Sequence, residues 1–448
     1  MSYGQGYHPQ FAQGSSGYAP QHFQPQPGYH QQFAPQPSAY NPQTVPNPTT
    51  YNPQFVPISD DRVATELLPS EVWWRGKYLW LLTQGYTLRD RYNPQWRPSW
   101  YDNPNLGGRT LDSQFLLHEN TIDAVCTKHG AITQVVLKRV DRFQGSDDPD
   151  EVGILGYFST EDVSSDPRNH TCPLLEVLRD LEDDRKAIIV MPALRPYNSP
   201  KFDSVGEALD FIRQMLRDSP SSTITGSPIG ELFVPIYVNY IYERCDRDVR
   251  SGSIMMNPSG IYNTHFDVWQ PKRKADWSGR IRPDHTRTES PPKYYIIDFG
   301  RSKRYDEAGM PPSHPPVRGA DTTVPELGSQ SCDPFPIDVY TVGNLILADF
   351  IEGNPLDSTP ITHQCFEFLR PLVIPMTAPN PRSRPSMQEA LSAFDTIVSQ
   401  QPGWLLRSQV KSSEKKSFGR RVGAGSAHWG RRLVYITRRL PAVPGTRR

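Results

Sequence analysis

Charged residues are missing from the first 59 positions of this 448-residue chain, and their absence limits what that stretch can fold into. From Met1 to Ser59 there is no Asp, Glu, Lys or Arg, and Gln, Pro, Tyr, Gly and Asn recur without a helical or strand period. Such a segment buries too little aliphatic surface to offset the entropy of ordering. We expect residues 1–59 to be a low-complexity disordered tail, with weak self-association through the spaced aromatic residues as the alternative.

The other end of the chain carries an excess of basic residues. Residues 401–448 hold twelve Lys or Arg against the single acid Glu414, and two arginine pairs bracket the apolar residues 433–436. This pattern suits an anionic membrane or an acidic partner, and a solvated basic tail is the alternative. Over the whole chain 48 basic residues balance 48 acidic ones, so we expect no specific nucleic-acid binding.

Between these ends, residues 60–400 alternate apolar runs with turn residues, which predicts one globular body. The five cysteines are scattered and never form a C-x-x-C pair, so zinc and redox chemistry are not expected. No basic and apolar leader opens the chain, and no window approaches 18 uninterrupted apolar residues. We expect a soluble protein in a reducing intracellular compartment, cytoplasmic or nuclear.

The segment YYIIDFGRSKRY, at residues 294–305, is a strand-like run that closes on Asp298, Phe299 and Gly300. The pattern predicts Asp298 at a strand end, with its carboxylate free to hold a cation. Upstream, a loop containing Asp248 leads into the short apolar segment 254–256, which precedes the Asp-Phe-Gly run. This order of elements is typical of a phosphotransferase.

Two charged residues further upstream extend this order. QVVLKRV places Lys138 at the end of an apolar strand, as in the V-A-I-K element whose lysine reaches nucleotide phosphates. EVGILGYF then offers Glu151 beside an apolar stripe at helical spacing. We expect Glu151 to pair with Lys138, because a lysine on a flexible stem needs a partner to orient its ammonium.

Downstream, Val324-Pro325-Glu326 stands where an A-P-E element would be. A buried carboxylate needs a cationic partner, and Arg384 in NPRSRPSMQEAL is the expected partner of Glu326. PFPIDVYTVGNLILADFI is apolar at helical period with Asp338 near its start. It predicts a buried central helix whose acid braces the catalytic loop.

From about Pro69 to the C-terminus, the sequence resembles a fungal family of protein-kinase-domain proteins. The matching phrases are DPRNHTCPLLEVL, SIMMNPSG, KYYIIDFGRSKRY and PFPIDVYTVGNLI. The resemblance implies an α+β, bilobal kinase-like fold, with a small β-rich N-lobe at 60–192, a larger helical C-lobe at 193–400 and the basic tail at 401–448. It also implies that ATP and Mg²⁺ bind between the lobes and that the substrate is a protein.

The resemblance assigns a role to each matching residue. Lys138 would contact the α- and β-phosphates of ATP, and Glu151 would hold Lys138 in place. Asp248 would accept the proton of the substrate hydroxyl. Asp298 would bind the metal, with Ser253 at the position of a second metal ligand.

The same resemblance assigns the adenine site to the segment AIIVMPAL. Met191 would be the gatekeeper residue, and Ala193 would lie in the connector 192–194 against which adenine stacks. Phe299 and Gly300 would complete the structural part of the Asp-Phe-Gly element.

The sequence departs from the kinase pattern near the phosphates. Only Gly130 occurs in ENTIDAVCTKHGAITQ, before Lys138, where kinases carry G-x-G-x-x-G. Without glycines the backbone approaches phosphates less closely, so nucleotide binding would rely more on Lys138 and metal. Ser253 replaces a metal-binding Asn, and Asp246 adds a second carboxylate beside Asp248.

Two long segments separate the motifs. Residues 217–244 contain prolines and a Ser/Thr/Gly cluster where a helix should lead into the catalytic loop, which indicates an insertion or retained intron sequence. Residues 261–292 are rich in Arg, Asp and Pro, and we expect a surface loop with Lys272, Arg273 and Lys274 as solvated charges.

These observations favour a protein kinase that transfers the γ-phosphate of ATP to a protein hydroxyl. We expect the hydroxyl of Ser or Thr, and Tyr stays open as an alternative. The rival is a pseudokinase that keeps the fold and binds nucleotide or partners without phosphotransfer. A third possibility is an assembly factor whose Gln/Tyr-rich and basic ends act while the fold is only a core.

Overall fold

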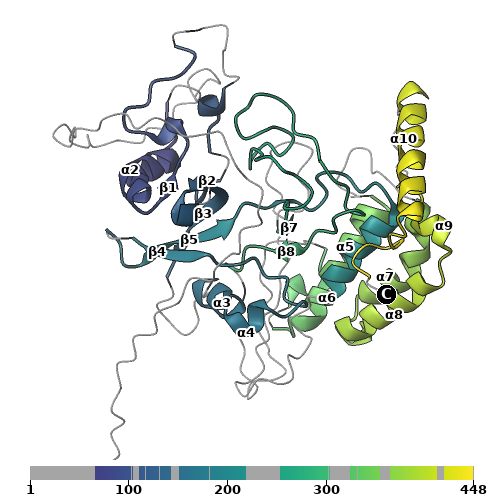
Figure 1. Cartoon of the computed structure of the whole chain (residues 1–448). Helices are drawn as coiled ribbons and strands as arrows, with labels where there is room; N and C mark the ends of the chain where they lie inside the picture. The colour runs from purple at the N-terminus through teal and green to yellow at the C-terminus, as the bar shows by residue number, and fades with distance from the viewer. Residues whose placement is uncertain are drawn as a thin grey trace, which may run out of the picture. The chain divides into compact units, whose positions relative to one another are not determined.

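The computed structural model describes residues 66–101, 103, 110–116, 118–130, 132–142, 151–180, 182–217, 253–300, 302, 323–329, 331–353, 364–410 and 418–446, without the side chains of 129 and 418–427. Within these residues the fold is mixed α+β (Figure 1). It contains a five-stranded antiparallel sheet, a three-stranded sheet and a set of helices that follow mainly in the second half of the chain.

The large sheet has the strand order β1-β2-β3-β5-β4, and every neighbouring pair is antiparallel. Its strands are β1 (Tyr86–Thr87), β2 (Thr121–Cys126), β3 (Thr133–Asp141), β4 (Glu176–Arg179) and β5 (Lys186–Pro192). The small sheet has the order β6-β7-β8, with β6 (Arg195–Pro196), β7 (Ile254–Met256) and β8 (Tyr294–Ile296). β-Branched residues make up four of the nine residues of β3 and three of the seven of β5, which suits a pleated and buried position inside the sheet.

The helices are α2 (Pro69–Thr83), α3 (Glu151–Phe158), α4 (Glu161–Ser164), α5 (Val205–Arg217), α6 (Phe335–Ile346), α7 (Arg370–Met376), α8 (Met387–Ser399), α9 (Gly403–Leu406) and α10 (Phe418–Thr437). A π-helical turn at Leu347–Ile351 extends α6, and 3-10 turns lie at Asp90–Tyr92, Leu111–Ser113, Lys128–Gly130, Pro325–Gly328, Gln364–Leu369 and Pro381–Ser383. The start of α8 is fixed by a capping box, because Ser386 and Glu389 satisfy each other's backbone N–H groups.

One face of the large sheet packs under α2 (Figure 1). Trp74 and Leu81 of α2 are fully buried against strand residues such as Leu137. A fully buried ion pair fixes the start of this layer: Arg91 donates to Glu71 at 2.9 Å, and both side chains have 0% exposure. Burying such a pair is tolerated because the N–H groups of Leu68 and Leu116 and the hydroxyl of Tyr92 also donate to Glu71.

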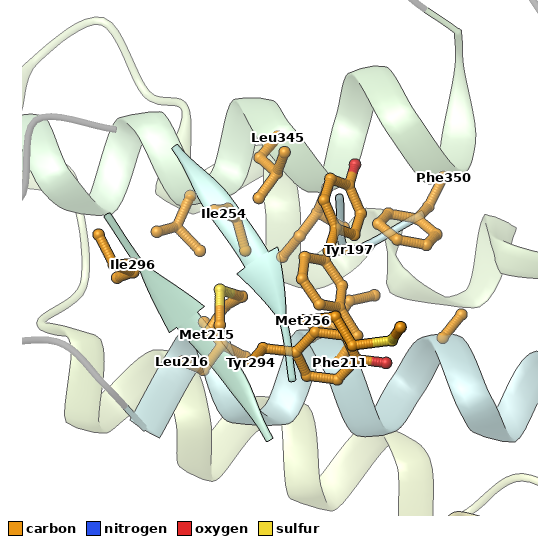
Figure 2. Close-up of a cluster of buried hydrophobic side chains, with 14 of the residues drawn as sticks. Tyr197, Phe211, Met215, Leu216, Ile254, Met256, Tyr294, Ile296, Leu345 and Phe350 are labelled. Atoms are coloured by element: carbon orange, nitrogen blue, oxygen red, sulfur yellow. The ribbon is translucent and has the colours of Figure 1, made fainter. Parts of the chain in front are cut away.

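The opposite face of the sheet joins a second and larger core. Ile189 and Met191 of β5 belong to the same buried cluster as α5, β7, β8 and α6. Figure 2 shows the centre of this cluster, where Tyr197 and Phe211 stack with ring centroids 4.3 Å apart. The alternation of the strands therefore divides the apolar residues between two cores, one on each side of the sheet.

The residues that the sequence placed in a basic tail form α9 and α10, and parts of them pack against α5. Val443 is 6% exposed and belongs to the larger core. The approach is close at Gly206 of α5, where an added Cβ would lie 1.8 Å from the carbonyl oxygen of Ala442. Glycine is required there because any side chain would displace the C-terminal segment.

The segment between β7 and β8, hereafter the insert (residues 257–292), differs from the expected surface loop. Ile261, Tyr262 and Phe266 are at most 5% exposed, so the prediction of a solvated loop was wrong for them. Lys272 and Lys274 are exposed as expected, whereas Arg273 lies over the ring of Trp277. The aromatic residues of the insert supply the apolar surface that the sequence prediction overlooked.

None of the helices in the described part of the chain combines the length and the apolar character needed to cross a bilayer.

Candidate functional site

The position of Lys138 follows from the alternation of β3. Val135 and Leu137 point into the core under α2, so Gln134, Val136 and Lys138 face the other way. In the register of the sheet, Lys138 lies between Thr121 of β2 and Ile189 of β5. Its side chain is 20% exposed.

Glu151 is the first residue of α3, a helix that the sequence predicted from its apolar stripe. Ile154 and Leu155 bury the helix against the larger core. The expected ion pair is present: Lys138 Nζ lies 2.7 Å from Glu151 Oε1 and 2.9 Å from Oε2. The carboxylate is 7% exposed, so the pair fixes the direction of the lysine stem.

Asp298 comes two residues after β8 and completes a three-residue cluster with Lys138 and Glu151, hereafter the triad. Lys138 Nζ donates to Asp298 Oδ1 at 2.7 Å. The backbone of Asp298 has φ 69°, a left-handed conformation that is uncommon for a residue other than glycine. Strained backbone of this kind is concentrated at functional sites, and here it turns the carboxylate towards the lysine.

Phe299 and Gly300 lock the turn after β8 onto α3. Phe299 N–H donates to Glu151 Oε1 at 3.2 Å, and the Phe299 ring stacks on Phe158 with centroids 6.4 Å apart. A Cβ at Gly300 would lie 3.2 Å from Glu151 Oε2, which is tighter than an ordinary contact. Glu151 therefore holds both the lysine and the backbone that carries Asp298.

The electrostatics of the triad favour a charged lysine. Burial alone would lower the pKa of Lys138, but the attraction of Glu151 and Asp298 outweighs it and leaves this pKa above its ordinary value. One ammonium thus serves two carboxylates. An incoming phosphate would replace a carboxylate as the partner of Lys138, and the released carboxylate of Asp298 would be available to a cation.

The donor set of the triad suits magnesium held jointly by protein and phosphate. The side chain of Asp298 is 28% exposed, the largest exposure in the triad. Among the described residues, no group of three or more His, Cys, Asp or Glu is arranged to hold a metal ion. Magnesium is commonly bound through one or two carboxylates plus substrate phosphates, so Asp298 fits that mode and a closed protein cage does not.

Three further predicted site residues lie on or next to the strands that carry the triad. Met191 of β5 is 7% exposed and pairs in register with Val136, beside Lys138. Ala193 N–H donates to the Gln134 carbonyl at 3.1 Å, so this donor is used within the sheet. Ser253 is 1% exposed, and its carbonyl accepts from Ile297 N–H at 2.9 Å, next to Asp298 in the chain.

A second predicted ion pair lies among the helices. Arg384 donates to Glu326 through two nitrogens, at 2.6 and 2.9 Å, and its guanidinium lies over the ring of Tyr340. Asp338 is 4% exposed in α6, the helix expected to be buried. Both carboxylates are enclosed by the chain, which suits a structural role.

Several predicted features lie outside the described residues. They include Asp248, the proposed proton acceptor, its neighbour Asp246 and all but Arg217 of the stretch 217–244. Most of the expected activation segment, 301–324, is also outside them.

A polar cluster that the sequence did not reveal covers the other end of the face that carries Lys138; it is hereafter the insert cluster. Asp123 of β2 lies opposite Val136 in register, and Arg89 Nε lies 2.9 Å from both of its carboxylate oxygens. Trp269 Nε1 of the insert donates to Asp123 at 2.8 Å. Arg89 also contacts Asp267 of the insert at 3.2 Å.

Gln134 extends the insert cluster along β3. Its amide donates to the Phe266 carbonyl at 2.8 Å, and Phe266 N–H donates back to Gln134 Oε1 at 3.1 Å. Gln134 and Lys138 face the same side of the sheet, so the insert covers part of the surface that adjoins the triad. The aromatic residues Tyr262, Phe266 and Trp269 were the available sequence signal, since solvated loops rarely carry three so close together.

The other end of the insert is fixed to the helices. Arg287 donates to the carbonyls of Tyr197 and Pro200, each at 2.6 Å. Thr288 donates through its N–H and its hydroxyl to Glu207 of α5, at 3.1 and 2.9 Å. The insert therefore connects the face of the sheet to α5.

The phrase DPRNHTC supports β8 from its second side. Ile296 N–H donates to the His170 carbonyl at 2.8 Å, and Cys172 N–H donates to the Ile296 carbonyl at 2.9 Å. His170 is 3% exposed, and burial lowers its pKa to about 4, although Nδ1 lies 2.8 Å from the Tyr294 carbonyl. The backbone that leads into Asp298 is thus held between β7 and this segment.

No protein-family model matches the chain, and no curated protein matches it significantly.

Proposed function

We propose that the chain is a protein kinase, which transfers the γ-phosphate of ATP to a hydroxyl of a protein substrate. One observation carries the proposal: Lys138 from β3, Glu151 from α3 and Asp298 from the turn after β8 converge within 2.9 Å of one ammonium nitrogen. A strand lysine, a helix glutamate and an Asp-Phe-Gly aspartate in this arrangement form the phosphate and metal site of kinases.

The proposal extends to the architecture. The large sheet with α2 and α3 would form the N-lobe, and α5 to α8 with the small sheet would form the C-lobe of a bilobal kinase-like fold. The strand order supports this division, because β3 and β5 are central and place Lys138 and Met191 on the face towards the larger core.

ATP with Mg²⁺ would supply the transferable phosphoryl group. Lys138 would leave Asp298 for phosphate oxygens, while Glu151 keeps its ammonium aimed at them. Asp298 would then offer its carboxylate to the cation. The substrate hydroxyl oxygen forms a bond to the γ-phosphorus, the bond from that phosphorus to the β–γ bridging oxygen breaks, and Asp248 takes the hydroxyl proton.

The insert cluster favours a second candidate, a pseudokinase. Asp123 and Met191, the proposed adenine-site residue, both pair in register with Val136, and Asp123 is bound to Arg89 and Trp269. A purine stacked there would have to displace buried charges from their partners, which is costly. In this alternative the fold binds a partner protein, or nucleotide weakly, and transfers no phosphate.

Transfer of phosphate from labelled ATP to a generic protein substrate separates the two candidates. The kinase proposal expects Mg²⁺-dependent incorporation that is lost in Lys138→Ala and Asp298→Ala. Lys128→Ala is the matched control, because Lys128 is a comparably exposed lysine in the turn between β2 and β3 and is paired with Glu176 of the same sheet. Incorporation that both triad substitutions leave unchanged would refute the kinase proposal, and nucleotide binding without incorporation would establish the pseudokinase.

A further inference from the structure

One side of α10 anchors the helix to the body of the protein. His428 Nε2 lies 3.1 Å from the Arg407 carbonyl, and Tyr435 donates to Thr286 Oγ1 of the insert at 2.8 Å. Arg431 forms a bidentate pair with Asp203, at 3.0 and 2.8 Å. His428 and Tyr435 are 5% and 6% exposed, so this side of the helix is fully used.

Another side of α10 exposes an apolar stripe formed by Trp429, Leu433 and Ile436. Their exposed fractions are 59%, 60% and 49%. Positions separated by four and then three residues fall on one side of an α-helix, so the three side chains form a continuous row. Figure 1 shows α10, in yellow, extending beyond the neighbouring α9.

Basic residues border this stripe. The guanidinium of Arg432 lies 4.7 Å from the centre of the Trp429 ring. Arg438 has 63% side-chain exposure, and Arg439, two residues beyond the end of α10 and with φ 52°, is also exposed. The sequence of α10 contains no Asp or Glu; Asp203 is paired with Arg431 on the anchored side, and Glu289 of the insert lies 3.4 Å from Arg438 in a partly exposed pair.

The charge of the chain is strongly divided along its length. Twelve of the 48 basic residues and one of the 48 acidic residues follow position 400. Because residues 1–59 carry no charge, residues 60–400 hold the remaining 36 basic and 47 acidic residues. A negatively charged surface would attract the C-terminal part and repel the rest, so the stripe would be turned towards that surface.

We infer that the apolar stripe of α10 with Arg432, Arg438 and Arg439 docks on an anionic lipid bilayer. A convex row of Trp, Leu and Ile beside arginines matches helices that lie in the plane of a membrane interface. Trp is well suited to the headgroup level, where an amphipathic ring contacts both lipid and water. The arginines would add attraction to acidic lipid headgroups, and no acid on the helix opposes it.

The test is co-sedimentation of the full chain with vesicles of phosphatidylcholine that contain phosphatidylserine, in comparison with phosphatidylcholine alone. The inference expects binding to the acidic vesicles that weakens as salt rises. Arg432→Gln/Arg438→Gln/Arg439→Gln should weaken it by about tenfold or more, because each arginine near the surface contributes. Equal binding to both kinds of vesicle would contradict the role of charge.

Trp429→Ser/Leu433→Ser/Ile436→Ser should likewise weaken binding by about tenfold or more through lost burial of apolar surface. Val72→Ser/Leu79→Ser/Leu82→Ser is the matched control, since it removes three exposed apolar side chains from α2. Wild-type binding by the α10 variant would overturn the inference. So would dimerisation of the wild-type chain, without vesicle binding, that the α10 variant abolishes; the stripe would then join two copies.

Discussion

One face of the large sheet carries a charged cluster near each end, and the two clusters differ in how far their side chains are exposed. At one end, the insert cluster encloses its charges, and Asp267 has 1% side-chain exposure. At the other end, the triad keeps Lys138 and Asp298 at 20% and 28% exposure. Both ends carry two carboxylates around one cation, so composition alone does not distinguish them.

This difference in exposure separates charges that stabilise the fold from charges that are available to a ligand. In the insert cluster, each carboxylate is satisfied by an arginine and an indole or backbone N–H group. In the triad, one ammonium is shared between two carboxylates and remains partly open to solvent. Enclosed and fully bonded charges stabilise a fold, whereas a partly open cation between carboxylates is suited to an anionic ligand.

The largest expected effect is on the insert cluster. Asp267→Ala should reduce the free energy of unfolding by about 3 to 5 kcal/mol, because it leaves the buried Arg89 without one of its two partners. Asp276→Ala, at an exposed position of the same insert, should change it by less than about 0.5 kcal/mol. Chemical denaturation measures both. Equal effects of the two substitutions would remove the distinction between enclosed and open charges.

The pH dependence of stability tests the role of His170, which holds the strand that leads into Asp298. The pKa of His170 in the folded chain is lowered to about 4, below its value of 6.5 when unfolded. The unfolded chain therefore binds the extra proton first, so stability falls as pH decreases from 6.5 towards 4, by roughly 3 kcal/mol in total.

His170→Gln should flatten this part of the stability profile, whereas His118→Gln, at an exposed position, should not. Denaturation midpoints across the acid range provide the measurement. An unchanged slope in His170→Gln would show that His170 is not the group responsible.

Weakening the contacts between the insert and β3 should make the surface beside the triad more accessible to nucleotide. Gln134→Ala removes both hydrogen bonds to Phe266 and should cost about 1 to 2 kcal/mol of stability. If the insert covers the purine side of the site, the same substitution should raise the affinity for Mg–ATP several-fold. Gln84→Ala, at the end of α2, is the control. A lower affinity in Gln134→Ala would mean that the insert forms part of the nucleotide site.

The smallest effect on stability is expected at the triad itself. Lys138→Met should reduce the free energy of unfolding by only about 1 kcal/mol, because water can solvate Asp298 in this partly open site and Glu151 keeps its hydrogen bond from Phe299 N–H. Lys128→Met, at the exposed pair with Glu176, should behave similarly. A loss as large as that of Asp267→Ala would make Lys138 a structural residue.

Short-range patterns in the sequence were sufficient for the triad and insufficient for the insert. Strand alternation around Lys138, the apolar stripe after Glu151 and the run into Asp298 each encode a local element, and the pairing of Lys138 with Glu151 follows from charge. The contacts of Asp123 with Arg89 and Trp269 join positions far apart in the chain, and no local pattern specifies them.

The C-terminal part shows the same limit. Its basic composition predicted a tail, but Gly206 of α5 leaves the space into which residues 440–446 pack. A glycine within a helical pattern ordinarily indicates only reduced helix stability, so the sequence did not predict that Gly206 would contact the C-terminal segment.

The most direct test of the account is binding of Mg–ATP to the full chain by calorimetry, in the wild type, Lys138→Met and the control Lys128→Met. The account predicts saturable, Mg²⁺-dependent binding that Lys138→Met weakens by at least about tenfold and Lys128→Met leaves unchanged, since Lys138 pairs with Asp298 whereas Lys128 pairs with Glu176. Binding of equal strength in all three proteins, or none in the wild type, would contradict the assignment of the triad as a phosphate site.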